Sequence, residues 1–262
     1  MPLSPWWTSR SGALAAVDPA FAGLVDAHAE AQVDLIDRLC ELPPGGRVLD
    51  LGCGGGRHSI LLQERGHAVV GVDLSQEIVA LAQENWETRN PGVDGPQFVV
   101  GDMRAPPVQG SFSVVLLMDA SLGVFDDDAE HLRVLTAAAD RLEPGGSLVI
   151  ELLNPYFWAH RNLTQHFPPG SVAANADILR SYRFDPLVGR VQDRITIFED
   201  GARRVLPTQS LRCWTPPEIA GLSSAAGFSQ VNIIGSDGWQ VPNGPGRLDP
   251  ESSATIWVLA RL

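Results

Sequence analysis

The chain contains 262 residues, of which 44% are hydrophobic and 19% are charged, a composition typical of a soluble globular protein with a sizeable core. All 19 basic residues are arginines, and the 31 acidic residues give the chain a net charge of -12. The absence of lysine excludes a lysine Schiff base and a P-loop phosphate site, and the acidic balance disfavours a nucleic-acid partner and favours a cationic or neutral small molecule.

The cysteines and the apolar stretches bear on the cellular compartment of the protein. Cys40, Cys53 and Cys213 are odd in number and lack the spacing of a zinc site or a disulfide framework, so we expect a reducing, cytoplasmic location and no bound metal. The N-terminus shows no basic start followed by an apolar run, and the other apolar stretches are only as long as strands. We therefore expect neither a signal peptide nor a membrane span.

The first 150 residues alternate between helical and strand patterns. Apolar residues recur at helical spacing between residues 18 and 40, which predicts one or two N-terminal helices. Buried strands are expected over 47–51, 68–73, 97–102, 113–119 and 147–152. Helices are expected over 57–65, 75–88 and 127–142. Five near-continuous apolar strands alternating with helices indicate a parallel sheet covered on both faces, an α/β doubly wound core.

The pattern changes after residue 154. Residues 156–176 show no clear periodicity. Strand-like segments follow at 179–184, 190–199 and 203–212, with turn residues between them, and they predict an inserted antiparallel meander. A helix is then expected over 215–226, opened by the capping box of Thr215 and Glu218. Two final strands are expected over 228–234 and 254–260.

The first strand leads directly into a turn with glycines at positions 52, 54, 55 and 56. A strand, a glycine-rich turn and a helix bring a ligand close to bare backbone, which predicts a nucleotide or nucleoside site. The dinucleotide spacing G-x-G-x-x-G is missing. Asp50, at the end of the strand, would repel a pyrophosphate but suits a cationic amino-acid group.

Carboxylates also end the next two strands. Asp73 ends the second strand, where a carboxylate can accept both hydroxyls of a ribose. Asp102 ends the third strand and is followed by Met103, so the pair offers an acceptor to an adenine amino group and an apolar face to its ring. Three acidic strand ends on one edge of a sheet predict a nucleoside pocket.

Five segments within residues 47–152 resemble, in order and spacing, the motifs of the class I S-adenosylmethionine-dependent methyltransferases. They are VLDLGCGGGRHS, VVGVDLS, VVGDMR, FSVVLLMDASLGVF and LEPGGSLVIEL. The resemblance implies S-adenosylmethionine as the cofactor and S-adenosylhomocysteine as its product. It places the glycines beside the methionine part, Asp73 on the ribose, and Asp102 with Met103 on the adenine. The cofactor-binding residues it implies are Asp50, Gly52, Cys53, Gly54, Gly56, His58, Asp73, Leu74, Asp102, Met103 and Met118.

The resemblance also completes the expected fold. It implies a Rossmann-like, seven-stranded α/β sheet, mostly parallel with a C-terminal antiparallel hairpin, together with the small antiparallel β insertion and an N-terminal helical lid. We divide the chain into the lid (1–41), the cofactor-binding core (42–153), the insertion that shapes the acceptor pocket (154–212) and the C-terminal part of the core sheet (213–262).

Methyl transfer from a sulfonium is an in-line displacement, so it needs alignment more than an enzymatic nucleophile. An acceptor that is protonated at neutral pH gains from a general base. The candidate bases are His28, Asp119, His160 and His166. Asp119 follows the fourth strand, next to the implied sulfonium position, and the histidines lie in the expected lid or the aperiodic stretch. A structural role is the favoured interpretation of each of these histidines, and packing on the cofactor side is the favoured one for His58, whereas His67 and His131 are expected at the surface.

Aromatic and arginine residues outside the main apolar strands favour a medium-sized organic acceptor, with a carboxylate that arginine could bind. The substrate-binding candidates are Tyr156, Trp158, Arg161, Arg180, Tyr182 and Trp239. Ordinary packing and exposed charge are the competing interpretations of these residues. The acidic tract 126–128 is expected to cap a helix rather than to bind a metal.

The expected function is the transfer of a methyl group from S-adenosylmethionine to a nitrogen, oxygen or carbon nucleophile of a small organic molecule, such as a specialised metabolite. We expect no nucleic-acid or membrane partner, and a monomer or a homodimer. No N-P-P-Y or D-P-P-Y motif follows the fourth strand, which disfavours methylation of nucleic-acid amines. Two alternatives stay open: a Rossmann-type NAD(P)-dependent oxidoreductase, and a non-methylating protein that retains the cofactor pocket.

Overall fold

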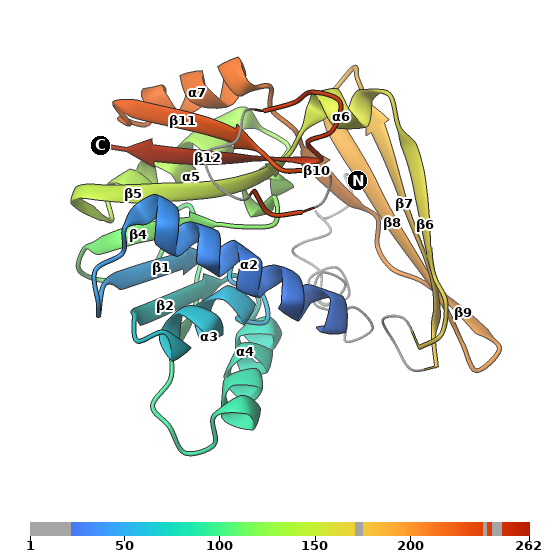
Figure 1. Cartoon of the computed structure of the whole chain (residues 1–262), viewed down its shortest axis with the longest axis horizontal. Helices are drawn as coiled ribbons and strands as arrows, with labels where there is room; N and C mark the ends of the chain where they lie inside the picture. The colour runs from blue at the N-terminus through green and yellow to red at the C-terminus, as the bar shows by residue number, and fades with distance from the viewer. Residues whose placement is uncertain (1–21, 171–174, 238–239, 243–247) are drawn as a thin grey trace.

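Two β-sheets lie side by side in the molecule (Figure 1), and the larger one carries the predicted cofactor site. The computed structural model describes residues 22–170, 175–237, 240–242 and 248–262, with the side chains of residues 22–27 excepted. The larger sheet consists of β1 (Arg47–Leu51), β2 (Ala68–Asp73), β3 (Gln97–Val100), β4 (Phe112–Leu117), β5 (Leu142–Leu153), β11 (Gln230–Gly235) and β12 (Thr255–Arg261).

The strand order in this sheet is β11-β12-β5-β4-β1-β2-β3. Strands β1 to β5 run parallel, whereas β12 is antiparallel to both of its neighbours. The expected seven-stranded Rossmann-like sheet with a C-terminal antiparallel hairpin is therefore confirmed. Because parallel strands end on the same side, Asp50, Asp73 and the residues after β3 and β4 share one edge, which we call the carboxyl edge.

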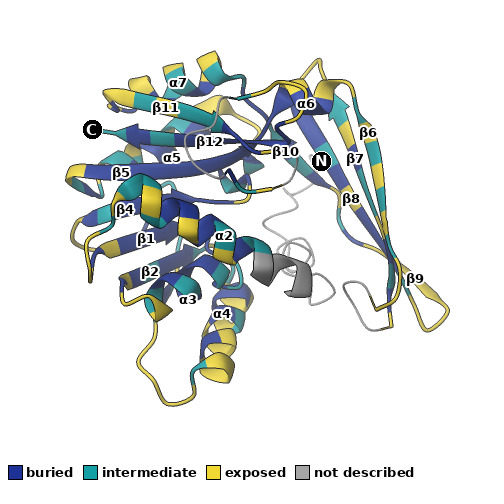
Figure 2. Ribbon diagram, in the orientation of Figure 1, coloured by how far each residue is buried: buried dark blue, intermediate teal, exposed yellow. Residues whose placement is uncertain are grey.

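Helices cover both faces of the larger sheet, as continuous apolar strands require. They are α2 (Ala22–Cys40), α3 (Arg57–Glu64), α4 (Gln76–Arg89), α5 (Asp128–Ala139) and α7 (Pro216–Ala225). On one face, Val33 and Ile36 of α2 pack with Leu62 of α3 against the strands. On the other face, Leu135 of α5 and Ile219 of α7 belong to the largest apolar cluster. Strands β1, β4, β5 and β12 are buried along most of their length, whereas the edge strands β3 and β11 are not (Figure 2).

The position of α2 bears on the expected N-terminal lid. Ala29, Val33, Leu35 and Ile36 are all fully buried, so this length of the helix is a layer of the core rather than a cover over the carboxyl edge. The lid remains a prediction for residues 1–21, which lie outside the described residues.

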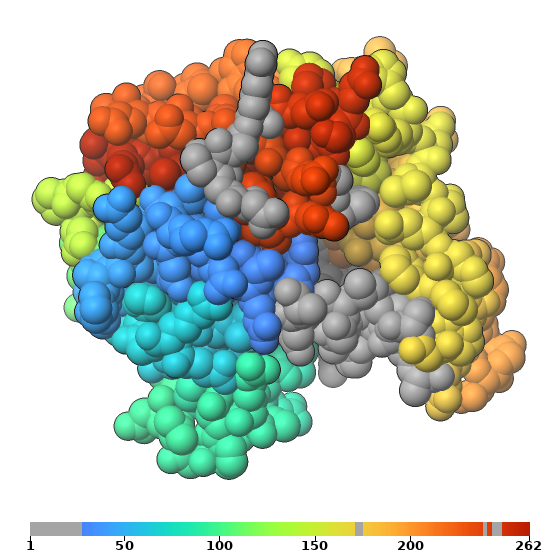
Figure 3. All heavy atoms as spheres, viewed as in Figure 1, coloured from blue at the N-terminus to red at the C-terminus, as the bar shows by residue number. Residues whose placement is uncertain are grey.

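The second sheet is the predicted antiparallel insertion. It consists of β6 (Asn162–Phe167), β7 (Asp177–Asp185), β8 (Arg190–Glu199), β9 (Ala202–Val205) and β10 (Gln209–Arg212). The order is β10-β8-β7-β6, with β9 also paired to β8, and every pairing is antiparallel. In the space-filling view this sheet forms a yellow and orange lobe on the right of the molecule (Figure 3). Among the helices of the described residues, none combines the length and apolarity needed to cross a membrane.

Two details of the insertion differ from the expectation. The stretch 156–176, expected to be aperiodic, contains a short helix, α6 (Pro155–Ala159), and the strand β6. The single strand expected over 203–212 is divided into β9 and β10. Pro207 lies at this division, and proline cannot donate a hydrogen bond to a β-ladder.

Arg190 ties the second sheet to the segment that follows β4, which contains the short helix η3 (Ser121–Val124). Its guanidinium, almost completely buried, donates to the carbonyl oxygens of Phe125 at 2.8 Å, Ser210 at 2.7 Å and Gly123 at 3.3 Å. A guanidinium can donate hydrogen bonds to several carbonyl oxygens at once because its five N–H groups are fixed in one plane. The insertion is thereby anchored next to the carboxyl edge.

Candidate functional site

The loop after β1 presents bare backbone at the carboxyl edge. Gly52, Gly54 and Gly56 all have positive φ, of 73°, 55° and 83° respectively, the left-handed region that glycine adopts without steric cost. The amides of Gly52 and Cys53 donate to the carbonyl of Val72 at 2.8 and 3.1 Å, which binds the loop to β2. A side chain at position 52 would place its Cβ 3.1 Å from the Cβ of Ser121. The loop is therefore packed tightly against Ser121 on one side, and its glycines carry no side chain that would keep a ligand from the backbone on the other side.

We expect Gly56→Ala to destabilise the protein by about 3 kcal/mol, because left-handed backbone and overpacking each cost about 1–3 kcal/mol. A Cβ at position 56 would approach the Phe98 ring to 2.8 Å. Gly66 provides a matched control, because its φ is 89° but nothing lies within 4 Å of its Cβ position. Urea unfolding should show a loss of only about 1 kcal/mol for Gly66→Ala. Equal losses in both variants would contradict the packing argument.

The three acidic residues predicted for the carboxyl edge have different surroundings. Asp50 is 1% exposed, and its carboxylate accepts a hydrogen bond from the Ser59 hydroxyl at 2.7 Å. Burial raises the pKa of Asp50 to about 6. Asp73 accepts from the amide of Gly54 at 3.1 Å and from that of Ser75 at 3.0 Å, and burial raises its pKa as well. Asp73 thus already holds the glycine loop, in addition to its predicted role on a ribose.

Asp102 is engaged by an arginine. Its carboxylate accepts from the Arg104 guanidinium, whose Nε lies 3.0 Å from each carboxylate oxygen, and this contact lowers the pKa of Asp102. Arg104 also pairs with Glu130 of α5. The expected contact between Asp102 and an adenine amino group therefore requires sharing or displacing Arg104.

A buried polar network lies beneath the carboxyl edge. The Gln32 side chain donates through Nε2 to the Glu151 carboxylate at 2.8 Å, and its Oε1 accepts from Nε2 of His58 at 2.8 Å. Glu151 also accepts from the amide of Asp119 at 3.3 Å. Burial raises the pKa of Glu151 to about 7 and holds that of His58 well below its ordinary value, so the imidazole is neutral at pH 7.

Sequence reasoning missed Gln32, Ser59 and Glu151. Glu151 left a visible signal, since it is a charged residue in the otherwise apolar run 148–153, and a buried charge usually has dedicated partners. Its partner Gln32 is 119 positions away along the chain, so no local pattern could reveal the pair.

Asp119 and His28, two of the four predicted bases, both interact electrostatically with Arg57. Asp119 forms an ion pair with Arg57, and its side chain is 48% exposed. Burial and the charge of Arg57 lower the pKa of His28, which keeps its imidazole neutral at pH 7. Asp119 and Ala120 both have positive φ, of 53° and 58°, which is costly for residues other than glycine. This strained turn directly follows β4.

The other two predicted bases lie elsewhere. His166 is on the second sheet, more than half exposed and paired with Asp177 of β7. Because Leu163 packs toward the larger sheet, alternation along β6 turns His166 to the opposite face. His160 is exposed at the C-terminal end of α6. We leave both residues out of the site.

Two histidines expected at the surface are buried, which corrects the prediction. His131 is fully buried, with its ring edge-on to those of Phe125 and Trp214 at centroid distances of 5.6 and 4.7 Å. Burial lowers its pKa to about 4. His67 is 7% exposed. The tract 126–128 does cap α5, since Asp127 accepts from the amide of Ala129.

The remaining cofactor candidates divide between the surface and the core. Leu74 is 42% exposed just beyond β2, as a residue facing an adenine ring would need to be. Met103 is partly buried, and Met118 is packed in the cluster beneath α2. The Cys53 side chain lies in the apolar cluster with Phe98, so the predicted cofactor contact of Cys53 falls to its backbone.

Two of the predicted substrate residues are core side chains. Trp158 is fully buried, and its Nε1 donates to the carbonyl of Ala254 at 3.2 Å. Tyr182 is nearly as buried and packs on it, with ring centroids 4.7 Å apart. The prediction that these rings line the acceptor pocket is corrected, because a composition rich in aromatic residues does not distinguish a pocket from ordinary packing.

The other predicted substrate residues have varied positions. Arg161 donates to the carbonyls of Phe157 and Glu251 and so acts as a structural link. Arg180 forms a bidentate pair with the buried Asp193 on the second sheet. Tyr156 is exposed on α6. Trp239 lies outside the described residues.

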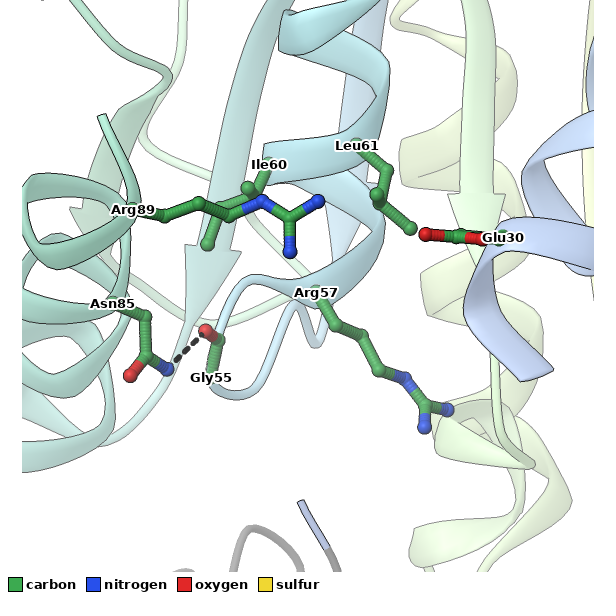
Figure 4. A pocket seen from close by; sticks show the side chains of 7 residues that line it. All are labelled: Glu30, Gly55, Arg57, Ile60, Leu61, Asn85 and Arg89. Carbon is green, nitrogen blue, oxygen red and sulfur yellow. Dashed lines mark hydrogen bonds between the residues drawn. The ribbon is translucent and has the colours of Figure 1, made fainter. Parts of the chain in front are cut away.

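A surface hollow of about 290 Å³ adjoins the glycine loop (Figure 4). Its lining comes from α2, α3, α4 and the loop, and comprises Glu30, Gly55, Arg57, Ile60, Leu61, Asn85 and Arg89. The Asn85 amide donates to the carbonyl of Gly55 at 2.9 Å, which fixes the loop against α4. The volume is at the lower limit for ligand pockets, so the hollow is a neighbour of the cofactor site rather than the whole of it.

Comparison with known proteins agrees with this arrangement. Residues 48–146 match the family described as a methyltransferase domain. The chain is 35% identical, over 111 residues, to the ubiquinone biosynthesis O-methyltransferase of Xanthomonas campestris, a match that covers 42% of this chain and 44% of that protein. The chain spans less than two thirds of the length of the curated relatives that it matches first.

Solved structures show the same fold over nearly the whole chain. An S-adenosylmethionine-dependent methyltransferase from Clostridium acetobutylicum superposes with a TM-score of 0.73 at 18% identity, covering 95% of this chain and 97% of that one. A cofactor-bound amino pentose methyltransferase from Micromonospora echinaspora superposes with a TM-score of 0.63 at 23% identity, covering 90% and 91%. Residues 48–146 therefore match a methyltransferase domain, and the chain has the fold of the S-adenosylmethionine-dependent methyltransferases to which it is similar.

Proposed function

We propose that this protein transfers a methyl group from S-adenosylmethionine to a nitrogen, oxygen or carbon nucleophile of a small organic molecule. The observation that carries the proposal is the charge of the site. Asp50 and Asp73 are carboxylates with raised pKa values beside a loop of bare backbone. Such groups favour a ligand that brings positive charge, and S-adenosylmethionine brings both an ammonium and a sulfonium group.

The residues of the carboxyl edge fit such a cofactor. Gly52, Gly54 and Gly56 offer backbone to its methionine part, and Asp73 offers carboxylate oxygens to its ribose. Leu74 is exposed where it can cover one face of the adenine. The second sheet, anchored through Arg190 to the segment after β4, lies beside this edge, where the acceptor must enter.

When bound, S-adenosylmethionine supplies an activated methyl group, and the protein has to align the acceptor and exclude water. His28 and Asp119, which both interact electrostatically with Arg57, are the groups we propose to orient the acceptor or to take its proton. A neutral imidazole is suited to that task because it can accept a proton at pH 7.

A small acceptor is supported by the amino pentose methyltransferase among the structural neighbours. We further propose a cytoplasmic protein that acts as a monomer or a homodimer without a nucleic-acid partner. A nicotinamide-dependent oxidoreductase is the weaker candidate, because the buried Asp50 would repel a pyrophosphate.

A labelling experiment tests the proposal. The protein is incubated with S-adenosylmethionine carrying a labelled methyl group and with a cell extract, and the products are identified by mass. The label should enter a small-molecule fraction with the wild-type protein and not with Asp73→Ala. Label in protein or nucleic acid would contradict the small acceptor, and S-adenosylmethionine binding without any transfer would favour the non-methylating alternative.

A further inference from the structure

Glu151 is a carboxylate within the continuously buried part of β5, residues 146–153. It is 4% exposed, and its neighbours on β5, Ile150 and Leu152, are fully buried. Burying a charged group is unfavourable unless other groups satisfy it. The contacts of Glu151 therefore indicate what this carboxylate does in the structure.

The side chain and the main chain of Glu151 both accept hydrogen bonds from the turn after β4. Its side-chain Oε2 accepts from the amide of Asp119 at 3.3 Å, and its main-chain oxygen accepts from the amide of Ala120 at 3.0 Å. Asp119 and Ala120 are the two consecutive residues with positive φ. Such backbone persists only when its surroundings fix it, and here a single residue binds both amides.

The same carboxylate reaches the helices on the other side. Gln32 of α2, which is fully buried, donates to Oε2 of Glu151 at 2.8 Å and accepts from His58 of α3. Arg57, adjacent to His58, forms the ion pair with Asp119. Glu151 is thus the point where α2, α3 and the turn meet.

We propose that Glu151 is a positioning residue, which fixes the left-handed turn at Asp119 and Ala120 and thereby sets where the Asp119 side chain stands at the carboxyl edge. This inference rests on the proposed function, because methyl transfer is what makes the position of Asp119 matter. The competing interpretation is that Glu151 contributes only to the stability of the core.

Hydrogen–deuterium exchange of the peptide 118–124 tests the local claim without any ligand. In Glu151→Leu the Asp119 amide loses its acceptor, and we expect it to exchange at least about tenfold faster than in the wild type. Glu151→Gln keeps an acceptor oxygen and should exchange within about threefold of the wild type. Ser147→Ala, a polar substitution at a buried site on the same strand, is the control and should leave the peptide unchanged.

Should Glu151→Leu not fold, Glu151→Asp takes its place, because the shorter side chain withdraws the carboxylate from Asp119 while keeping its charge. The same loss of protection is expected. Wild-type protection of the peptide in either variant would overturn the proposal. Failure of Glu151→Gln to restore protection would also overturn it.

The pH dependence of S-adenosylmethionine binding separates positioning from stability alone. The charged and titratable groups around Glu151 are Arg57 and Asp119, His58 through Gln32, and His28, whose pKa is lowered by the charge of Arg57. Wild-type affinity should rise between pH 6 and pH 8 as Glu151 ionises, and Glu151→Gln, which stays neutral like protonated Glu151, should show less of that rise and bind more weakly than the wild type at pH 8. Identical pH profiles would contradict the proposal. If the wild-type protein binds no S-adenosylmethionine, the proposed function fails, and the exchange data still decide the role of Glu151 in the turn.

Discussion

Replacing Asp73 with alanine is expected to weaken S-adenosylmethionine binding by at least about 100-fold. In this variant the ribose hydroxyls have no carboxylate to which they can donate. The amides of Gly54 and Ser75 also lose the acceptor that holds the glycine loop in the wild type. Hydrogen bonds to a charged group contribute about 1.5–3 kcal/mol each, and a tenfold change in affinity corresponds to about 1.4 kcal/mol. Isothermal titration calorimetry measures the effect directly.

Two control variants accompany this measurement. Asp73→Asn retains one acceptor oxygen for the Gly54 amide but loses the negative charge, so an intermediate loss of about tenfold is expected. Asp94→Ala removes an exposed carboxylate in the loop before β3 and should leave binding unchanged. Circular dichroism and thermal unfolding establish that each variant is folded. Binding by folded Asp73→Ala within about threefold of the wild type would show that Asp73 does not contact the cofactor.

The ligand-free protein is expected to lose stability through Asp50 as the pH rises from about 4 to about 7. Burial raises the pKa of Asp50 from 3.8 to about 6 in the folded state. Below pH 4 the carboxyl group is protonated in both the folded and unfolded states, and its stabilising contribution is fully present. That contribution is lost as the pH rises through the folded pKa, because the folded protein must then ionise a buried group. One unit of pKa corresponds to 1.36 kcal/mol, so the loss is on the order of 3 kcal/mol.

The contribution of Asp50 is isolated by comparison with Asp50→Asn. Urea unfolding at pH 5 and at pH 8 gives the change in the free energy of unfolding for each protein. The change should be less unfavourable in Asp50→Asn, which keeps an acceptor for Ser59 but cannot ionise. Asp94→Asn makes the same charge change at an exposed position and should behave like the wild type. Saturating S-adenosylmethionine should stabilise the wild type more at pH 8 than at pH 5, because a cationic ligand favours the ionised carboxylates. A parallel pH dependence in wild type and Asp50→Asn would contradict this account.

The larger sheet could be predicted from sequence because its strands are unbroken apolar runs between glycine and proline turns. The expected bounds of 47–51 and 68–73 coincide with those of β1 and β2, and 190–199 coincides with β8. The strand β6 was missed although its residues alternate between exposed and half-buried positions. That alternation is the period-two pattern of a strand with one face covered, but one of the half-buried positions is the polar Gln165, so apolar residues do not alternate regularly in the sequence.

The candidate site was predictable where it depends on local sequence and unpredictable where it depends on long-range contacts. Asp50 and Asp73 follow from the strand patterns, because parallel strands end at one edge. The network of Gln32, His58 and Glu151 joins α2, α3 and β5, and only the folded chain brings these elements together. The burial of Trp158 also depends on long-range contacts, with β7 and with the segment before β12. Because these contacts cannot be seen in the local sequence, Trp158 was wrongly predicted to line the acceptor pocket.

The most direct test of the central claim is a calorimetric titration of the folded protein with S-adenosylmethionine, S-adenosylhomocysteine and NAD in parallel. We predict saturable binding of S-adenosylmethionine and of S-adenosylhomocysteine at a stoichiometry of about one per chain, and none of NAD, because the acidic carboxyl edge favours a cation and repels a pyrophosphate. Binding of NAD with no binding of either S-adenosyl compound would contradict the account.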